Sequence, residues 1–142
     1  MNWTYKGKEL IDRPEDTYGF IYLITYTNGK KYVGQKKFYS EVNLPALKSG
    51  EQRPDSVRIG KNLNGKRVYF DKVKKPNNWK TYKGSSEHSL GLTIAHKEIL
   101  LMVKLKKSLL YQEMKAIMCM GCLETEDYLN INILRKFYKG NI

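Results

Sequence analysis

The stretch GFIYLITYTNGKKYVGQKK, residues 19–37, constrains the fold of this chain more than any other. Two apolar runs, each with a tyrosine inside it (Tyr22 and Tyr32), flank Thr-Asn-Gly at residues 27–29, which is the pattern of a β-hairpin. A glycine at the third position suits the left-handed residue of a three-residue loop with a G1 bulge. We therefore expect a hairpin whose register is set by this loop.

The register decides whether the two phenols can act together, because side chains alternate between the faces of a strand. With the three-residue loop, Tyr22, Tyr32 and Lys36 share one face, and Gly34 leaves open space beside Tyr22. With a two-residue turn the tyrosines would point to opposite faces. Taken alone, the hairpin favours tyrosines that only pack in the sheet, since aromatic residues are common in strands. The other face is expected to be the core-facing one, with Ile21, Leu23 and Val33.

A second unusual residue lies in a helix predicted over residues 109–121, with Ser108 as its N-cap. On a helical wheel, Glu113 falls inside an apolar stripe formed by Leu105, Leu109, Ala116, Ile117 and Met120. Gln112 and Lys115 occupy the opposite, polar side. A carboxylate in such a stripe is costly to bury unless it is paired or binds a metal. Glu113 is therefore half of a hidden salt bridge or a functional carboxylate, and we favour the second.

The balance of charge points to a polyanionic partner. The chain carries 26 Lys and Arg against 14 Asp and Glu, a net charge of +12. Such an excess favours nucleic acid over a solubility feature or membrane-surface binding. Residues 38–78 hold nine Lys and Arg against four acids and several prolines, and we interpret them as an insertion that follows a phosphate backbone. Inside it, Asn64-Gly65 predicts a second, basic hairpin.

The predicted nucleic-acid-binding residues lie in this insertion and beside it. They are Lys37, Arg58, Lys61, Lys66, Arg67, Lys74, Lys75, Trp79, Lys80 and Tyr82. The two aromatic residues among them would stack on bases or wedge into a groove, but filling the core beside the sheet explains them equally well. No helix-turn-helix or zinc finger is evident, so strong site specificity would require a homodimer or a partner protein.

The rest of the chain predicts a small mixed α/β (α+β) fold, a single domain over residues 1–142. Residues 1–18 read as a polar lead-in, residues 87–95 as a short helix capped by Ser85 or Ser86, and EILLMVKL as a buried strand. Cys119 and Cys122 form a CxxC pair, which we interpret as two reduced cysteines. No apolar run reaches the roughly 18–20 residues of a membrane helix, and no signal-peptide core is evident, so we expect a cytoplasmic protein.

The residues resemble the GIY-YIG family of DNA endonucleases. Its signature reads here as Phe20-Ile21-Tyr22 and Tyr32-Val33-Gly34. More specifically, GFIYLIT, NGKKYVGQKK, NWKTYKGSS, KEIL and LLYQEMK are similar to the small phage-encoded, homing-type or Seg-like members, over about residues 18–133. The resemblance implies a three-stranded antiparallel sheet flanked by helices, DNA as the partner, and the cytoplasm of a phage-infected bacterium as the location.

The resemblance also implies the site. Tyr22 and Tyr32 correspond to the motif tyrosines, Glu113 to the glutamate that binds Mg²⁺ (or Mn²⁺), and Asn130 to an asparagine that follows it. Tyr22 would take a proton from water, either directly or through a pKa lowered by a neighbouring cation such as Lys36, and Tyr32 would orient the water or phosphate by hydrogen bonding. Lys36 and Asn130 complete the predicted catalytic set.

One departure from the family leaves two functions open. The family usually has an arginine on the helix after the second motif, and residues 85–95 contain none. Lys36, Lys37 or His88 would then supply the charge, and the chain would be a metal-dependent DNA endonuclease or nickase. The alternative is a catalytically inactive DNA-binding relative. An RNA-binding protein without a site would instead pair Glu113 with a lysine.

Overall fold

The computed structural model describes residues 1–141, which form two compact units. The larger unit comprises residues 1–38 and the chain from residue 78 onward, and the smaller unit is residues 39–77. Within the described residues, no helix has the length and apolar character needed to cross a membrane.

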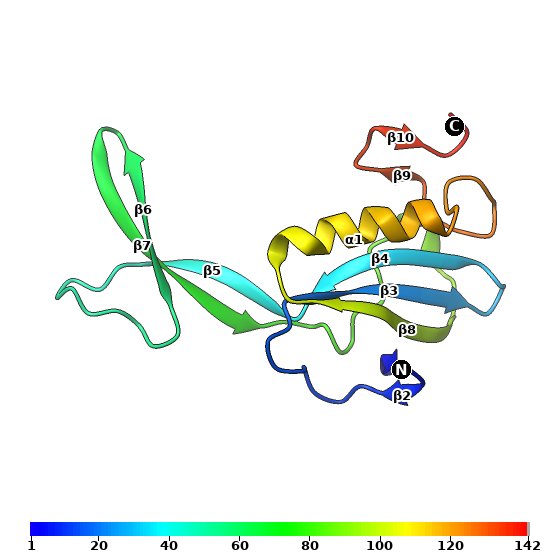
Figure 1. Ribbon diagram of the computed structural model, residues 1–142, viewed down its shortest axis with the longest axis horizontal. Coiled ribbons are helices and arrows are strands. Elements are labelled where there is room, and N and C mark those ends of the chain that lie inside the picture. The colour runs from blue at the N-terminus through cyan, green and yellow to red at the C-terminus, as the bar shows by residue number, and fades with distance from the viewer. Residues whose placement is uncertain (142) are drawn as a thin grey trace. The chain divides into compact units, whose positions relative to one another are not determined.

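The larger unit is a mixed sheet with α1 packed on one face (Figure 1). Its elements are β1 (Thr4–Tyr5), β2 (Lys8–Glu9), β3 (Gly19–Tyr26), β4 (Lys31–Lys37), the 3-10 helix η1 (Glu87–Ser89), β8 (Ile94–Val103), α1 (Lys106–Cys119), β9 (Asn132–Ile133) and β10 (Phe137–Tyr138). The strand order in the sheet is β2-β1-β8-β3-β4, and β1 runs parallel to β8 while the other pairs are antiparallel.

The predicted sheet of three antiparallel strands flanked by helices is therefore wrong in its count. The sheet has five strands, and α1 is the one α-helix among the described residues. Residues 1–18, expected to be a polar lead-in, contribute β1 and β2, and Trp3 is only 1% exposed. The indole N–H of Trp3 donates to the backbone oxygen of Trp79 at 2.7 Å. That partner lies 76 residues away along the chain, so no local sequence pattern predicts β1 and β2.

The predicted register of the first hairpin is confirmed. Tyr22 lies opposite Gly34 and Ile24 opposite Tyr32. The loop closes with the Tyr26 N–H donating to the Lys30 oxygen at 2.9 Å. Gly29 has a φ of +86°, the left-handed conformation that the three-residue loop requires.

Both faces of this hairpin are buried, not only the aliphatic one. Ile21 and Val33 are buried on the face toward α1, as expected for the core-facing side. The tyrosine face forms an aromatic core in which Phe20 contacts Trp3 at 5.1 Å between ring centroids. Trp79 is 6% exposed and joins this core, in agreement with the core-filling interpretation of this residue. Its large apolar ring is worth more in the core than in water.

The helices differ from expectation at their starts. Helix α1 begins at Lys106, with Leu105 as its N-cap and without a side-chain cap, so Ser108 lies in the first turn. The predicted helix over residues 87–95 is reduced to η1, because Gly91 takes a φ of +80° and the chain then enters β8. The strand β8 is the predicted strand, extended toward its N-terminus, but it is only partly buried, since Leu100 and Leu101 are 36% and 40% exposed.

Lys97 is a buried cation that the sequence analysis did not predict. It is 2% exposed, and its Nζ donates to the backbone oxygens of Met1 and Lys80, both at 3.3 Å. The Nζ also lies 4.3 Å from the centroid of the Trp3 ring. Burial, with Lys83 nearby, lowers the pKa of Lys97 to about 8. Lys97 thus ties the first residues and the segment after residue 78 to β8.

The smaller unit is a three-stranded antiparallel sheet in the order β5-β7-β6, formed by β5 (Tyr39–Pro45), β6 (Val57–Leu63) and β7 (Lys66–Pro76). The predicted turn at Asn64-Gly65 is confirmed, since Leu63 pairs with Lys66 and both turn residues have positive φ. Two residues with positive φ are the requirement of a type I′ turn.

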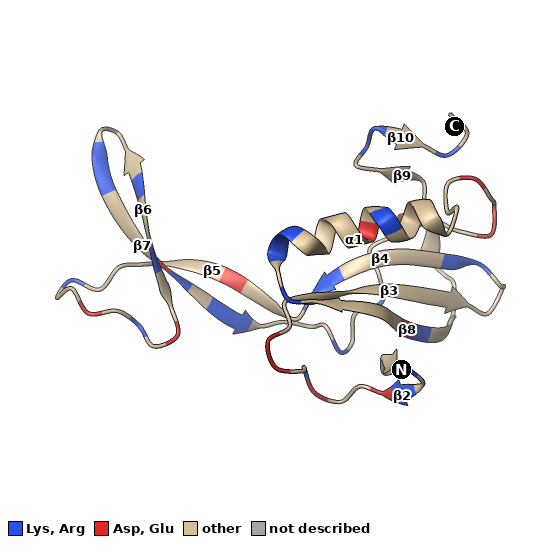
Figure 2. Ribbon diagram, in the orientation of Figure 1, with Lys and Arg blue, Asp and Glu red and all other residues tan. Residues whose placement is uncertain are grey.

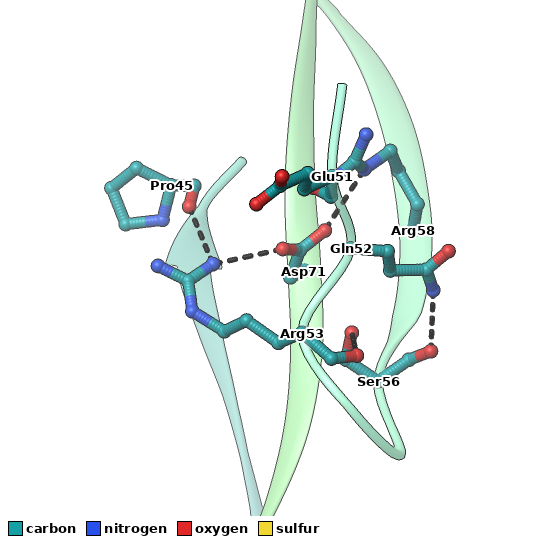
Figure 3. Close-up of polar contacts among 7 residues, drawn as sticks. All are labelled: Pro45, Glu51, Gln52, Arg53, Ser56, Arg58 and Asp71. Atoms are coloured by element: carbon teal, nitrogen blue, oxygen red, sulfur yellow. Dashed lines mark hydrogen bonds and ion pairs between the residues drawn. The ribbon is translucent and has the colours of Figure 1, made fainter. Parts of the chain in front are cut away.

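A buried carboxylate organises this unit (Figure 3). Asp71 is 0% exposed, and its two oxygens accept from Arg53 at 2.8 Å and from Arg58 at 3.0 Å. The hydrogen bond from Arg58 is the main cause that holds the pKa of Asp71 below its usual value. Arg58 also donates to the backbone oxygen of Glu51. Arg58 therefore serves the unit's own structure, and its predicted role at phosphates stays a prediction.

Candidate active site

The edge strand β4 brings the two faces of the sheet within reach of one cavity. In the sheet β4 pairs with β3 alone, and its other side is partly covered by the chain after α1, where the Lys31 N–H donates to the Asp127 oxygen and the Leu129 N–H donates to the Lys31 oxygen. Tyr32 projects from one face of β4, and Gln35 projects from the other, toward α1. The cavity, of about 500 Å³, is lined by Tyr32, Ser85, Ser86, Glu87, His88, Leu110, Glu113, Met114, Ile117, Leu129, Asn130, Ile131, Asn132, Ile133, Leu134 and Arg135. Tyr32 and Glu113, predicted as site residues from separate parts of the sequence, thus line the same cavity.

Glu113 is held by an amide, not by a cation. Its Oε2 accepts a hydrogen bond from Gln35 Nε2 at 2.5 Å. No Lys, Arg or His among residues 1–141 forms an ion pair with Glu113. Burial raises the pKa of this carboxyl, while the hydrogen bond from Gln35 opposes the rise. The hidden salt bridge, and with it the lysine pairing expected of an RNA-binding protein, is not what the structure contains.

The two motif tyrosines form a cluster with Tyr82. The ring centroid of Tyr22 lies 6.2 Å from that of Tyr32 and 6.0 Å from that of Tyr82. Tyr22 shares a hydrogen bond with Tyr82, and Tyr32 shares one with Ser85. Tyr82 therefore belongs to this cluster, a role that the expectation of base stacking missed.

The predicted lowering of the Tyr22 pKa is wrong. Tyr22 is 0% exposed, and burial, followed by the neighbouring Tyr82 and Tyr32, raises its pKa far above the usual value. The Lys36 ammonium lies 4.2 Å from the centroid of the Tyr82 ring, and its own pKa is lowered by burial. Both tyrosines are neutral phenols near neutral pH, because burial also raises the pKa of Tyr32.

Gly34 leaves the space that the Tyr22 hydroxyl occupies. A Cβ at Gly34 would lie 2.4 Å from the oxygen and 2.5 Å from the adjoining ring carbon of Tyr22. Gly84 closes the same region, with Tyr22 Oη at 3.7 Å from a Cβ placed there. The glycine of the second motif is thus a packing requirement of the first motif's tyrosine.

Asn130 joins the chain after α1 to the side of β4 that faces away from β3. Its Oδ1 accepts from the Val33 N–H at 3.0 Å, and its Nδ2 donates to the Val33 oxygen at 2.8 Å. The buried amide therefore replaces a neighbouring strand for one residue. It lines the cavity from this fixed position, where its polar atoms are already engaged.

The cations of the cavity are not those that the sequence suggested. Lys36 lies over Tyr82, and the cavity is lined by His88 and Arg135. His88 was among the expected substitutes for the family arginine, whereas Arg135 and Gln35 were missed. Alternation along β4 could have placed Gln35 toward the helix, but no sequence signal relates Arg135 to β4.

The donor set suits one kind of metal. Among the described residues, no group of three or more His, Cys, Asp or Glu side chains is arranged to hold an ion. A zinc site is thereby unsuited, since zinc takes three or four protein ligands. Mg²⁺ keeps several waters and often binds proteins through one or two carboxylates beside phosphate. Glu113, half-buried in a polar cavity, fits that pattern.

Comparison with protein-family models gives a match over residues 3–133, to the family described as "Putative endonuclease segE, GIY-YIG domain". The matched residues include the hairpin, the insertion, α1 and Asn130. Comparison with curated proteins and with solved structures gives no match.

The space beside Tyr22 can be tested by filling it. We expect Gly34→Ala to reduce the free energy of unfolding by about 1–3 kcal/mol, because Tyr22 cannot shift without disturbing the aromatic core. In a Tyr22→Ala background the same change should cost far less, since the colliding atoms are gone. Urea unfolding of the four proteins measures this coupling. Additive effects of the two substitutions would contradict the packing role of Gly34.

Proposed function

Because the chain belongs to the GIY-YIG family of the SegE type, an endonuclease domain family, we propose that it is a Mg²⁺-dependent DNA endonuclease or nickase that hydrolyses a phosphodiester at the β4 edge. The observation that carries the proposal is that Tyr32 and Glu113 line the same cavity. Hydrolysis of a phosphodiester needs, in one place, a group that can bind a metal or accept a proton and hydrogen-bond donors for the phosphate oxygens. This cavity offers both.

Glu113 would hold Mg²⁺ (or Mn²⁺) with waters completing its shell, and the ion would polarise the phosphate and stabilise the leaving oxygen. Gln35 fixes the carboxylate through its hydrogen bond to Oε2. Because burial raises the pKa of Glu113, this hydrogen bond also favours the ionised form that a cation requires.

The two tyrosines take different parts in the proposal. Tyr32 lines the cavity, so its hydroxyl can contact the phosphate or the attacking water while Ser85 holds it. Tyr22 is completely buried and acts through Tyr82 and Tyr32, which makes it a positioning residue. A neutral phenol orients water by hydrogen bonding and does not need to ionise.

Arg135 is proposed to bind the scissile phosphate in place of the family's helix arginine. It lines the cavity together with Glu113, and its side chain is exposed to an incoming ligand. The short η1 cannot present an arginine as a longer helix would, and its residues include none. A guanidinium suits phosphate because its fork of donors can bind two oxygens.

Binding of the DNA would come from exposed lysines and arginines of both units; Figure 2 marks all Lys and Arg in blue. The exposed cations of the predicted set are Lys37, Lys61, Lys66, Arg67, Lys74, Lys75 and Lys80. Lys80 also forms an ion pair with Asp12 at 3.7 Å, and Lys74 lies over the Tyr39 ring. Affinity from such contacts falls steeply with salt.

A catalytically inactive DNA-binding relative is the second candidate. It is favoured by the shortened helix after Ser86 and by the complete burial of Tyr22. The same basic residues would serve this function. Cleavage is the property that separates the two.

Plasmid relaxation tests the proposed chemistry. We expect the natural protein to nick or linearise supercoiled plasmid with Mg²⁺ or Mn²⁺ and not with EDTA. Glu113→Gln should lower the rate by 10²-fold or more, and Tyr32→Phe and Tyr22→Phe by about tenfold or more each. The matched control is Tyr111→Phe, since Tyr111 is an exposed tyrosine of α1. If the natural protein binds DNA in a salt-sensitive way and never cuts, the inactive relative is the correct reading.

The role of Gln35 can be read from the pH profile of nicking. Removing its hydrogen bond in Gln35→Leu leaves burial unopposed, so the pKa of Glu113 rises further. Activity that needs the carboxylate is lost as pH falls through that pKa, so the acid limb of the profile should move to higher pH. At the alkaline plateau the rate should stay within about threefold of the natural rate. Gln112→Leu, on the other side of α1, should leave the profile in place; an equal shift there would refute the assignment.

Arg135 and its neighbour form a natural pair for testing phosphate binding. Arg135→Ala should lower the nicking rate by about 10²-fold, because a cation at the phosphate is lost. Lys136→Ala removes the same charge from an exposed residue that does not line the cavity, and it should change the rate less than threefold. Equal losses in both variants would show that only net charge matters.

A further inference from the structure

The β6–β7 hairpin of the smaller unit carries cations and no acids near its turn. Residues 57–70 contain Arg58, Lys61, Lys66 and Arg67, and no Asp or Glu. All but Arg58, which Asp71 engages, are exposed and form no ion pair with any acid among the described residues. In Figure 2 the arm on both sides of the turn is marked by basic residues. This hairpin is thus electrostatically complementary to a polyanion.

The side chains of the hairpin sort into two faces by strand alternation. On one face, called the reading face below, Asn62 lies opposite Arg67 and Gly60 lies opposite Tyr69. On the other face Lys61 lies opposite Val68, and Lys66 lies at the turn. Amide and guanidinium are therefore paired on one side, and ammonium groups stand on the other.

The absence of a side chain at Gly60 is explained by packing on the reading face. Its backbone is ordinary strand without positive φ, so it is not required by the turn. A Cβ there would lie 3.0 Å from Arg67 Nε and 3.2 Å from the Tyr69 ring. The Arg67 guanidinium lies 5.1 Å from the centroid of that ring. Gly60 thus leaves the space in which Arg67 stacks on Tyr69, although a glycine inside a strand lowers the stability of that strand.

A tight turn places these groups where a groove could receive them. The hairpin turns over Asn64 and Gly65 alone, so Asn62 and Arg67 are two residues from the tip. A two-stranded antiparallel ribbon fits the major groove of B-form DNA, which is about 12 Å wide. Asparagine and arginine are the side chains that bind adenine and guanine edges bidentately there. The base of the hairpin is anchored by the contacts of Arg58 with Asp71.

We propose that the β6–β7 hairpin enters the major groove of duplex DNA and that Arg67 and Asn62 read base edges, while Lys61 and Lys66 contact phosphates. The inference rests on DNA being the substrate and adds sequence preference to it. A-form RNA is a poorer occupant, because its deep, narrow major groove does not admit a ribbon. Gly60 and Tyr69 hold the Arg67 fork before binding, which reduces the entropy lost on recognition.

The test is selection from a random duplex DNA pool by the full chain in EDTA, so that no cleavage is involved. We expect the natural protein to enrich sequences with a preferred guanine or adenine step. Arg67→Lys keeps the charge but loses the fork, so it should relax the preference at one base pair about tenfold and leave the salt slope unchanged. Lys66→Gln should weaken binding to all sequences alike and lower the salt slope by about 1.

Lys48→Gln is the matched control, since Lys48 is an exposed lysine of the same unit outside the hairpin. It should leave the sequence preference intact. A natural protein without preference, a preference unchanged in Arg67→Lys, or equal binding of duplex RNA would overturn the inference. Because the selection needs no metal, its result is independent of plasmid nicking, which tests the catalytic proposal alone.

Discussion

The pairing of β3 with β4 is the constraint on which the candidate site depends. Gly29, in the left-handed conformation, allows a three-residue loop, and that loop puts Tyr22 opposite Gly34. A shift of one residue would move every side chain of β4 to the other face, so Tyr32 would leave the aromatic cluster and Gln35 would leave Glu113. The position of β4 at the sheet edge then lets both faces contribute to one cavity. A central strand would have separated them.

Burial supports the site and at the same time limits its chemistry. Tyr22 gains packing in an aromatic core, but burial raises its pKa and keeps the phenol neutral. The same effect on Glu113 is opposed by one hydrogen bond from Gln35. A site arranged in this way favours orientation of water and phosphate by fixed dipoles over ionisation of a tyrosine. For the proposed cleavage, this argues against Tyr22 as the group that ionises.

The positive charge of the chain is divided between structure and surface. The half-buried Arg53 and Arg58 neutralise the buried Asp71, and Lys97 is held by carbonyl groups and Trp3, so these cations are engaged by groups of the protein itself. The cations around the Asn64-Gly65 turn are exposed. Net charge alone would have treated all of them as equivalent. Removing a partner from a buried charge is costly, whereas removing an exposed lysine changes mainly long-range attraction.

The sequence by itself determined the features that depend on neighbours along the chain. Both hairpin turns, the β3–β4 register, the apolar strand β8 and the unusual place of Glu113 follow from loop residues and periodicity. Only the tertiary structure decided which distant groups meet. Trp3 reaches Trp79, Asn130 replaces a strand beside Val33, and Arg135 joins Glu113 in one cavity. Sequence patterns record local geometry, but such meetings depend on how whole elements pack, because burying apolar surface and satisfying backbone polar groups are properties of the complete fold.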